Sequence, residues 1–307
     1  MRRVFGWPVV WALLTFGATS PAATLKAKSD SLEQWKLATI HALQEKNEPR
    51  SLATAALLSY PAKTGLELSK RASTLAPENG PIGWLYLQFC ANSPGCEVRE
   101  AATAMRWIDA DNAAAWLPLL AIAERQGDTV EVERILMDMA RTNRFDVYWN
   151  PLVILTFDSL KASQSVKYGL SDWARLTYAS EIAGATLMPS FTPLIDICRE
   201  AGSERRDACL KISKIMQRGD TILAQLAGFA IEKHLVAPDS REARAISERR
   251  RGIEWRKTMA TEFDSPLLPW VKNARARWRV SRMRTLPREE DVYIAILREH
   301  GLVIDPP

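Results

Sequence analysis

The sequence has few of the residues that form catalytic and metal sites. Its 307 residues include only three His, four Cys and 14 Gly. The histidines, His41, His234 and His300, are far apart, and no metal-binding pattern such as H-E-x-x-H includes them. Gly-rich phosphate loops and G-x-S-x-G nucleophile motifs are missing as well. The sequence therefore predicts a protein that is not an enzyme and that binds no cofactor or metal.

Long apolar runs are also scarce, and the clearest one lies at the start of the chain. Residues 4–19 carry no charge, follow Arg2 and Arg3, and precede the small residues of 20–23. This order is typical of a secretory signal peptide, with cleavage after Ala22 or Ala23. A membrane anchor is the alternative, although the run is short for a span, which needs ~20 apolar residues. We predict a signal peptide over residues 1–23 and a periplasmic or secreted mature protein.

The four cysteines all lie beyond this segment. Cys90 and Cys96 enclose a short loop that contains a Pro-Gly turn, and Cys198 and Cys209 flank ten residues. Four cysteines allow three pairings, and an oxidising compartment favours the two local ones, Cys90–Cys96 and Cys198–Cys209. A zinc or thioredoxin-like redox site is disfavoured because no C-x-x-C spacing is present and no His lies nearby.

Helical periodicity dominates the rest of the chain. Val132, Ile135, Leu136 and Met139 recur at i, i+3, i+4 and i+7, and charged residues occupy the opposite face. Alternating strand patterns and Asn-Gly hairpin turns are missing. The predicted fold class is therefore all-α.

Three tryptophans recur at nearly equal intervals within this helical sequence. Trp84, Trp116 and Trp149 are 32 and 33 residues apart, and similar turns at 76–79 and 109–112 precede the first two. A helix–turn–helix unit of this length with an early Trp resembles the tetratricopeptide repeat. The resemblance implies antiparallel helix pairs stacked into a solenoid that binds another protein on its concave surface.

The repeat pattern has two departures and a limited extent. Pro118 falls inside an expected helix and should kink it, and the Cys90–Cys96 loop replaces the usual Gly-Asp turn of the first unit. We predict a repeat region over residues 24–165. A less regular helical region, in which the tryptophan period is lost, is expected over residues 166–307.

The second region contains a basic segment. Residues 241–288 hold 14 Lys and Arg against 5 Asp and Glu. If residues 270–285 are helical, four cations share one face that could bind an acidic protein or an anionic membrane surface rather than contribute to folding. These four are Lys272, Arg275, Arg279 and Arg282. The alternative is an ordinary solvated surface, and export argues against nucleic acid as the partner.

Together these patterns predict an exported, non-enzymatic helical-repeat protein that binds another protein in the cell envelope. Two other functions stay open. One is a cell-envelope hydrolase whose site consists of unremarkable residues, and the other is a peripheral adaptor that uses the basic segment at a membrane surface.

Overall fold

The structure is a computed structural model that describes residues 21–60, 63–163, 170–264 and 268–307. Within these ranges it contains 15 α-helices, one short 3₁₀ helix and no β-strand, which confirms the all-α class. The predicted signal peptide lies outside the described residues except at its end, where residues 21–23 begin the first helix. None of the described helices combines the length and the apolar character that a membrane crossing needs.

The chain divides into two compact units, residues 1–38 and 39–307. Helix α1 begins in the first unit and ends in the second, and everything that follows concerns the second unit. The elements up to residue 139 are α1 (Pro21–Lys46), α2 (Pro49–Leu58), α3 (Lys63–Leu75), α4 (Gly80–Ala91), α5 (Val98–Ile108), η1 (Ala113–Trp116), α6 (Leu117–Gln126) and α7 (Thr129–Met139).

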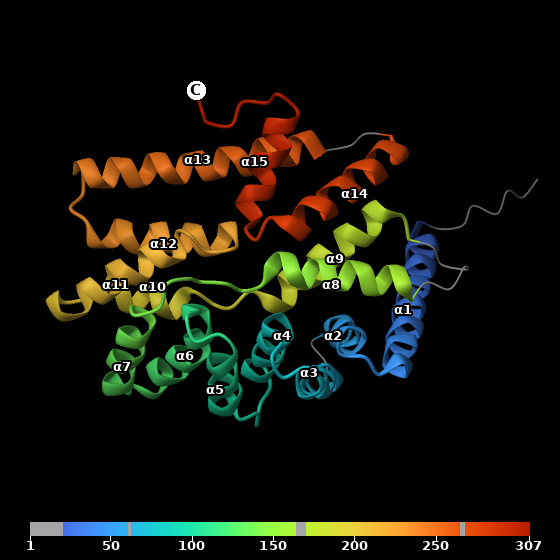
Figure 1. Cartoon of the computed structure of the whole chain (residues 1–307), viewed down its shortest axis with the longest axis horizontal. Helices are drawn as coiled ribbons and strands as arrows, with labels where there is room; N and C mark the ends of the chain where they lie inside the picture. Colours follow the sequence, from blue (N-terminus) through green and yellow to red (C-terminus); the bar gives the residue numbers. More distant parts are fainter. Residues whose placement is uncertain (1–20, 61–62, 164–169, 265–267) are drawn as a thin grey trace, which may run out of the picture. The chain divides into compact units, whose positions relative to one another are not determined.

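Helices α2 to α7 form three consecutive pairs (Figure 1). Helix α2 packs on α3, α4 on α5 and α6 on α7, and α3 and α5 each contact the helix that begins the next pair. The apolar positions of α7 that the sequence indicates are all buried, as amphipathic packing requires. This part of the chain therefore consists of helix pairs that lie side by side.

The two matching turns in the sequence perform the same task in the structure. Asn79 accepts a hydrogen bond from the backbone N–H of Ile82 (3.1 Å), and Asn112 accepts one from Ala114 (3.1 Å). Each asparagine thus caps the helical segment that carries the following tryptophan. The 33-residue interval between these two residues corresponds to a repeated local structure.

Pro118 does not kink a helix as the sequence predicts. The helical run after Asn112 is divided into η1 and α6, so Pro118 lies in the first turn of α6. An N–H at that position has no partner within the helix, and proline is accepted there without loss of a hydrogen bond. The expectation of a kink is therefore wrong.

The third tryptophan occupies a different environment from the first two. Trp149 is the first residue of α8 (Trp149–Ala162), which packs mainly on α9 (Asp172–Leu187), α2 and α14 (Pro269–Thr285). Helix α7 packs mainly on α6 and α11 (Ser203–Met216). Because α8 returns toward α2 (Figure 1), Trp149 does not begin a further pair beside α7.

The remaining helices contact one another and parts of the earlier helices. Helix α11 pairs with α12, α13 contacts both α12 and α15, and α14 lies against α8, α9 and α15. The elements not yet bounded are α10 (Thr192–Arg199), α12 (Ile222–Leu235), α13 (Arg241–Asp264) and α15 (Glu289–Glu299).

Asp220, in the turn between α11 and α12, joins distant parts of this unit. Its carboxylate accepts hydrogen bonds from the backbone N–H groups of Val147 (2.9 Å) and Trp149 (3.0 Å). Its carbonyl oxygen accepts one from the backbone N–H of Glu289 at the start of α15 (2.8 Å). One buried residue therefore connects the beginnings of α8 and α15.

Candidate binding groove

The described part of the chain contains no group of three or more His, Cys, Asp and Glu side chains that could hold a metal ion. A cavity of about 630 Å³ forms a groove bordered by α4, α6 and the segment from Met188 into α10. Apolar side chains of α6 supply much of its lining, together with those of the 188–193 segment. The lining residues on α6 are Leu117, Pro118, Ala121, Ile122, Glu124 and Arg125.

Gln88 supplies a polar group in the α4 wall of this groove. Its side chain is only 2% exposed, and Nε2 is buried without a hydrogen-bond partner in the described residues. A buried amide N–H without an acceptor costs roughly 1–3 kcal/mol of stability. An unpaired polar group in the wall of a groove is typical of a site where a ligand supplies the missing acceptor.

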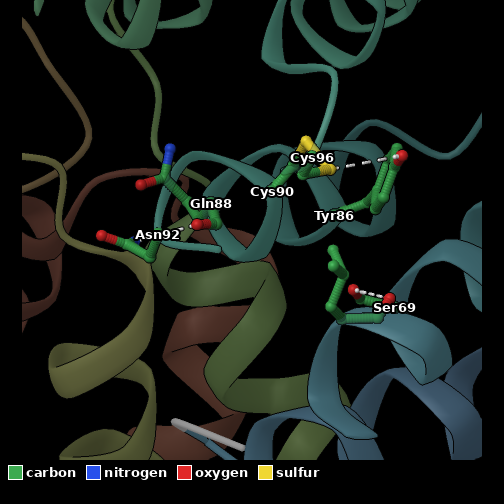
Figure 2. The surroundings of a disulfide bond; sticks show 7 residues. Ser69, Tyr86, Gln88, Cys90, Asn92 and Cys96 are labelled. Atoms are coloured by element: carbon green, nitrogen blue, oxygen red, sulfur yellow. Dashed lines mark hydrogen bonds between the residues drawn. A yellow bond between two sulfur atoms is a disulfide. The ribbon is translucent and has the colours of Figure 1, made fainter. Parts of the chain in front are cut away.

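Asn92 neighbours Gln88 along the α4 wall of the groove. Figure 2 shows Gln88 and Asn92 on one side of α4, with the Cys90–Cys96 disulfide and Tyr86 on another. The Asn92 side-chain amide donates to the backbone oxygen of Gln88 (2.9 Å), which places the two side chains one turn apart along the same wall. Gln88 and Asn92 therefore place two amide side chains in this wall, beside the apolar side chains of α6.

The disulfide at the end of α4 braces this wall. Cys90 and Cys96 are joined with an Sγ–Sγ distance of 2.05 Å, as the sequence predicts. The loop that they close runs from the end of α4 to the start of α5, and Ala91, Asn92 and Val98 all line the groove. The disulfide thus restrains the segment that carries these lining residues.

The second disulfide braces the opposite wall. Cys198 on α10 and Cys209 on α11 are joined at 2.03 Å, which is the other predicted pairing. Thr192, Pro193 and Asp196 of α10 line the groove. Since Cys198 lies one turn beyond Pro193 and Asp196, its bond to α11 limits the movement of this wall.

Charges of both signs surround the opening. Glu124 and Arg125 project from the end of α6, and Asp196 lies across from them on α10. Arg125 donates through Nε to the backbone oxygen of Ala121 (3.1 Å), while Asp196 pairs with Arg199 (2.8 Å). An apolar floor, a free amide donor and a mixed-charge rim suit a polypeptide segment, which has apolar side chains and carbonyl acceptors.

The four basic residues that the sequence indicates are not part of this groove. All lie on α14, and each is partly buried beside a ring or a carboxylate of another part of the chain. Their neighbours are Trp173 for Lys272, Phe263 for Arg275, Tyr293 for Arg279, and Trp278 and Glu299 for Arg282. The four cations therefore contact rings and carboxylates of the chain itself, and their predicted role in partner or membrane binding stays a prediction.

Sequence reasoning did not identify Gln88. The signal is present nevertheless, because Gln88 is the one amide side chain in the otherwise apolar run from Ile82 to Cys90. A polar residue in the middle of a buried helix needs a partner, and here the described residues supply none for Nε2.

Comparison with known proteins adds no residue to this site. No protein-family model, curated protein or solved structure matches the chain. The groove is therefore selected by its own volume, its largely apolar lining and the unpaired amide of Gln88, which together are typical of a ligand site.

Proposed function

We propose that the chain is an exported helical-repeat protein, similar to tetratricopeptide-repeat proteins, that binds a segment of another protein in the groove between α4 and α6. The capped helical segments that begin 33 residues apart support the repeat relationship. The two disulfides support an oxidising compartment. The observation that carries the proposal is the buried Gln88 amide, which lines the groove and has no acceptor there.

A bound peptide segment would satisfy both parts of this surface. A backbone carbonyl of the partner accepts the Gln88 N–H, while apolar side chains of the partner cover Leu117 and Ile122 on the floor. The volume of about 630 Å³ falls within the range of ligand pockets and accommodates a few side chains.

Site-specific photocrosslinking in the cells of origin tests this function. A benzoylphenylalanine at Ile122 lies in the groove, whereas one at Met137, which is exposed on α7, lies outside the lining. We expect a discrete protein adduct at Ile122 only. Adding Ala121→Trp to the Ile122 probe should remove the adduct, because the indole fills the floor.

Two results would contradict the proposed function. One is the same adduct pattern from Ile122 and Met137. The other is an Ile122 adduct that persists in the presence of Ala121→Trp, since the groove would then not be the contact surface.

A further inference from the structure

A second cavity, of about 610 Å³, lies apart from the groove between α11, α12, α13 and the segment 302–307. Its lining is strongly charged, whereas the groove lining is largely apolar. The charged lining residues are Lys214, Arg218, Glu248, Arg249, Arg256, Glu290 and Asp305. Lys214 and Arg249 are already engaged by the buried Glu232 behind them.

Arg256 is the central cation of this cavity. Its Nη2 pairs with Glu290 (2.9 Å) and its Nη1 with Asp305 (2.8 Å), while Nε is buried without a partner in the described residues. Gly252, one turn earlier on α13, lines the cavity, and a Cβ there would be in ordinary van der Waals contact with Arg256 Nη2 (3.4 Å). A glycine inside a helix is unfavourable by roughly 0.5–1 kcal/mol relative to alanine, so Gly252 lowers the stability of α13.

Few interactions hold the segment 302–307 at the border of the cavity. Trp255 Nε1 donates to the backbone oxygen of Val303 (3.2 Å), and the N–H of Leu302 donates to the oxygen of Leu297 (2.8 Å). The remaining polar contact is the Asp305–Arg256 ion pair, in which the Asp305 side chain is 79% exposed. An ion pair with so exposed a partner contributes about 0–1 kcal/mol, so the segment can exchange with a competitor.

The charges that line the cavity indicate which chemical group would replace Asp305 there. With the buried Glu232 behind them counted, four cations face four carboxylates when Asp305 is in place, and three carboxylates when it leaves. Arg218 is exposed at the edge and has no ion pair among the residues described. The vacated cavity therefore attracts a carboxylate with a neighbouring apolar group that can take the position of Pro306.

We propose that this cavity is a binding site for an acidic peptide segment of a partner protein, and that Asp305, in the segment that borders the cavity, takes the position of the partner's carboxylate as an internal competitor. The carboxylate of the partner pairs with Arg256, as the Asp305 carboxylate does. Because the internal segment is tethered, it competes at an effective concentration of the order of millimolar, and a partner must exceed that competition.

A peptide with the sequence of residues 302–307, blocked at both ends and labelled with fluorescein, tests the proposal by fluorescence anisotropy. Its only charge besides the dye is the Asp side chain. In the full chain, Asp305→Lys places a cation against Arg256 and releases the internal segment. We expect this variant to bind the peptide about two- to fivefold more tightly than the unaltered chain, because the ion pair that holds the competitor in place contributes up to about 1 kcal/mol.

Variants in the Asp305→Lys chain define the site. Arg218→Gln should weaken peptide binding several-fold without affecting the fold, and Gly252→Met should block the cavity floor. The matched control is Arg250→Gln, since Arg250 pairs with Glu254 on the same helix and does not line the cavity. This control should leave affinity unchanged.

Two measurements would overturn the proposal. One is equal affinity of the peptide for the Asp305→Lys chain and the unaltered chain. The other is equal affinity for a peptide in which Asp is replaced by Asn, because the carboxylate would then not be recognised.

Discussion

The side chain of Asn112 pairs with the backbone of Asp146 through two hydrogen bonds, Nδ2 to the carbonyl oxygen and the Asp146 N–H to Oδ1, each of 2.9 Å. The same Oδ1 accepts the N–H of Ala114. One buried amide thus caps η1 and holds the segment that follows α7. Asp109, three residues earlier, binds both Arg144 and Tyr148 in the same segment. These contacts direct the chain from the helix pairs into α8.

Replacing Asn112 should therefore destabilise the protein strongly. Asn112→Ala removes a cap and leaves the backbone groups of Asp146 without their partners, so we expect a loss of about 2–4 kcal/mol. Asn143→Ala is the matched control, because Asn143 binds Asp111 at an exposed position and should cost less than about 1 kcal/mol. Urea unfolding measures both values. Equal losses would mean that the Asn112 network contributes little.

Replacing Gln88 should have opposite effects on stability and on binding. Gln88→Met keeps the length of the side chain and removes the unpaired amide, so the free energy of unfolding should rise by about 1 kcal/mol. The crosslink from Ile122 should weaken, because the donor to the partner is lost. Gln126→Met, at the exposed end of α6, should change neither quantity. Lower stability with unchanged crosslinking would show that Gln88 has only a structural role.

The Cys90–Cys96 disulfide should support both the fold and the groove. The loop-entropy model assigns about 2–3 kcal/mol to a loop this short, so replacing both cysteines with Ser should lower the free energy of unfolding by that amount. We also expect a weaker Ile122 crosslink, since the residues of this loop form part of the α4 wall. If the crosslink is unaffected while stability falls, the loop does not shape the site.

Asp220 should make stability depend on pH. Burial raises its pKa to about 7, and the carboxylates of Asp146 and Glu289 act in the same direction, against the two backbone N–H bonds that favour ionisation. The folded state therefore holds this proton more tightly than the unfolded chain, whose Asp pKa is near 3.9. The stabilisation is complete below about pH 4 and is lost as pH rises toward 7.

The Asp220→Asn variant isolates this contribution because it stays neutral. The unfolding free energy of the unaltered chain minus that of the variant should fall between pH 4 and pH 7. Urea unfolding across this pH range measures the difference. A difference that stays constant or rises would mean that the two backbone donors keep Asp220 ionised.

The cations of α14 should contribute to folding rather than only to surface charge. Arg275 lies over the Phe263 ring (3.8 Å), and Arg282 pairs with Glu299 (2.6 Å). Changing both to Gln should cost about 1–2 kcal/mol, given about 0.5–1 kcal/mol for a cation–π contact and a similar amount for the ion pair. The double change of Arg250 and Arg251 to Gln, on the exposed face of α13, serves as the control. If the free energy of unfolding of the α14 variant is unchanged, these cations contribute only surface charge.

The sequence alone determined the features that depend on neighbouring residues. Helical periodicity predicted the all-α class, because amphipathic spacing acts within one helix. The short loops between Cys90 and Cys96 and between Cys198 and Cys209 predicted both pairings, because close partners meet most readily. The turns at 76–79 and 109–112 were likewise visible in the sequence, since a turn is formed by neighbouring residues.

Only the tertiary structure decided which surfaces these helices cover. Periodicity indicates the apolar side of a helix but not its partner, so the return of α8 to α2 could not be inferred from the tryptophan intervals. The groove depends on residues about 100 positions apart, from Gln88 on α4 to Pro193 on α10. The cations of α14 looked exposed in sequence because a long side chain can reach either water or a ring. Their contacts with α9, α13 and α15 exist only once those helices have packed together.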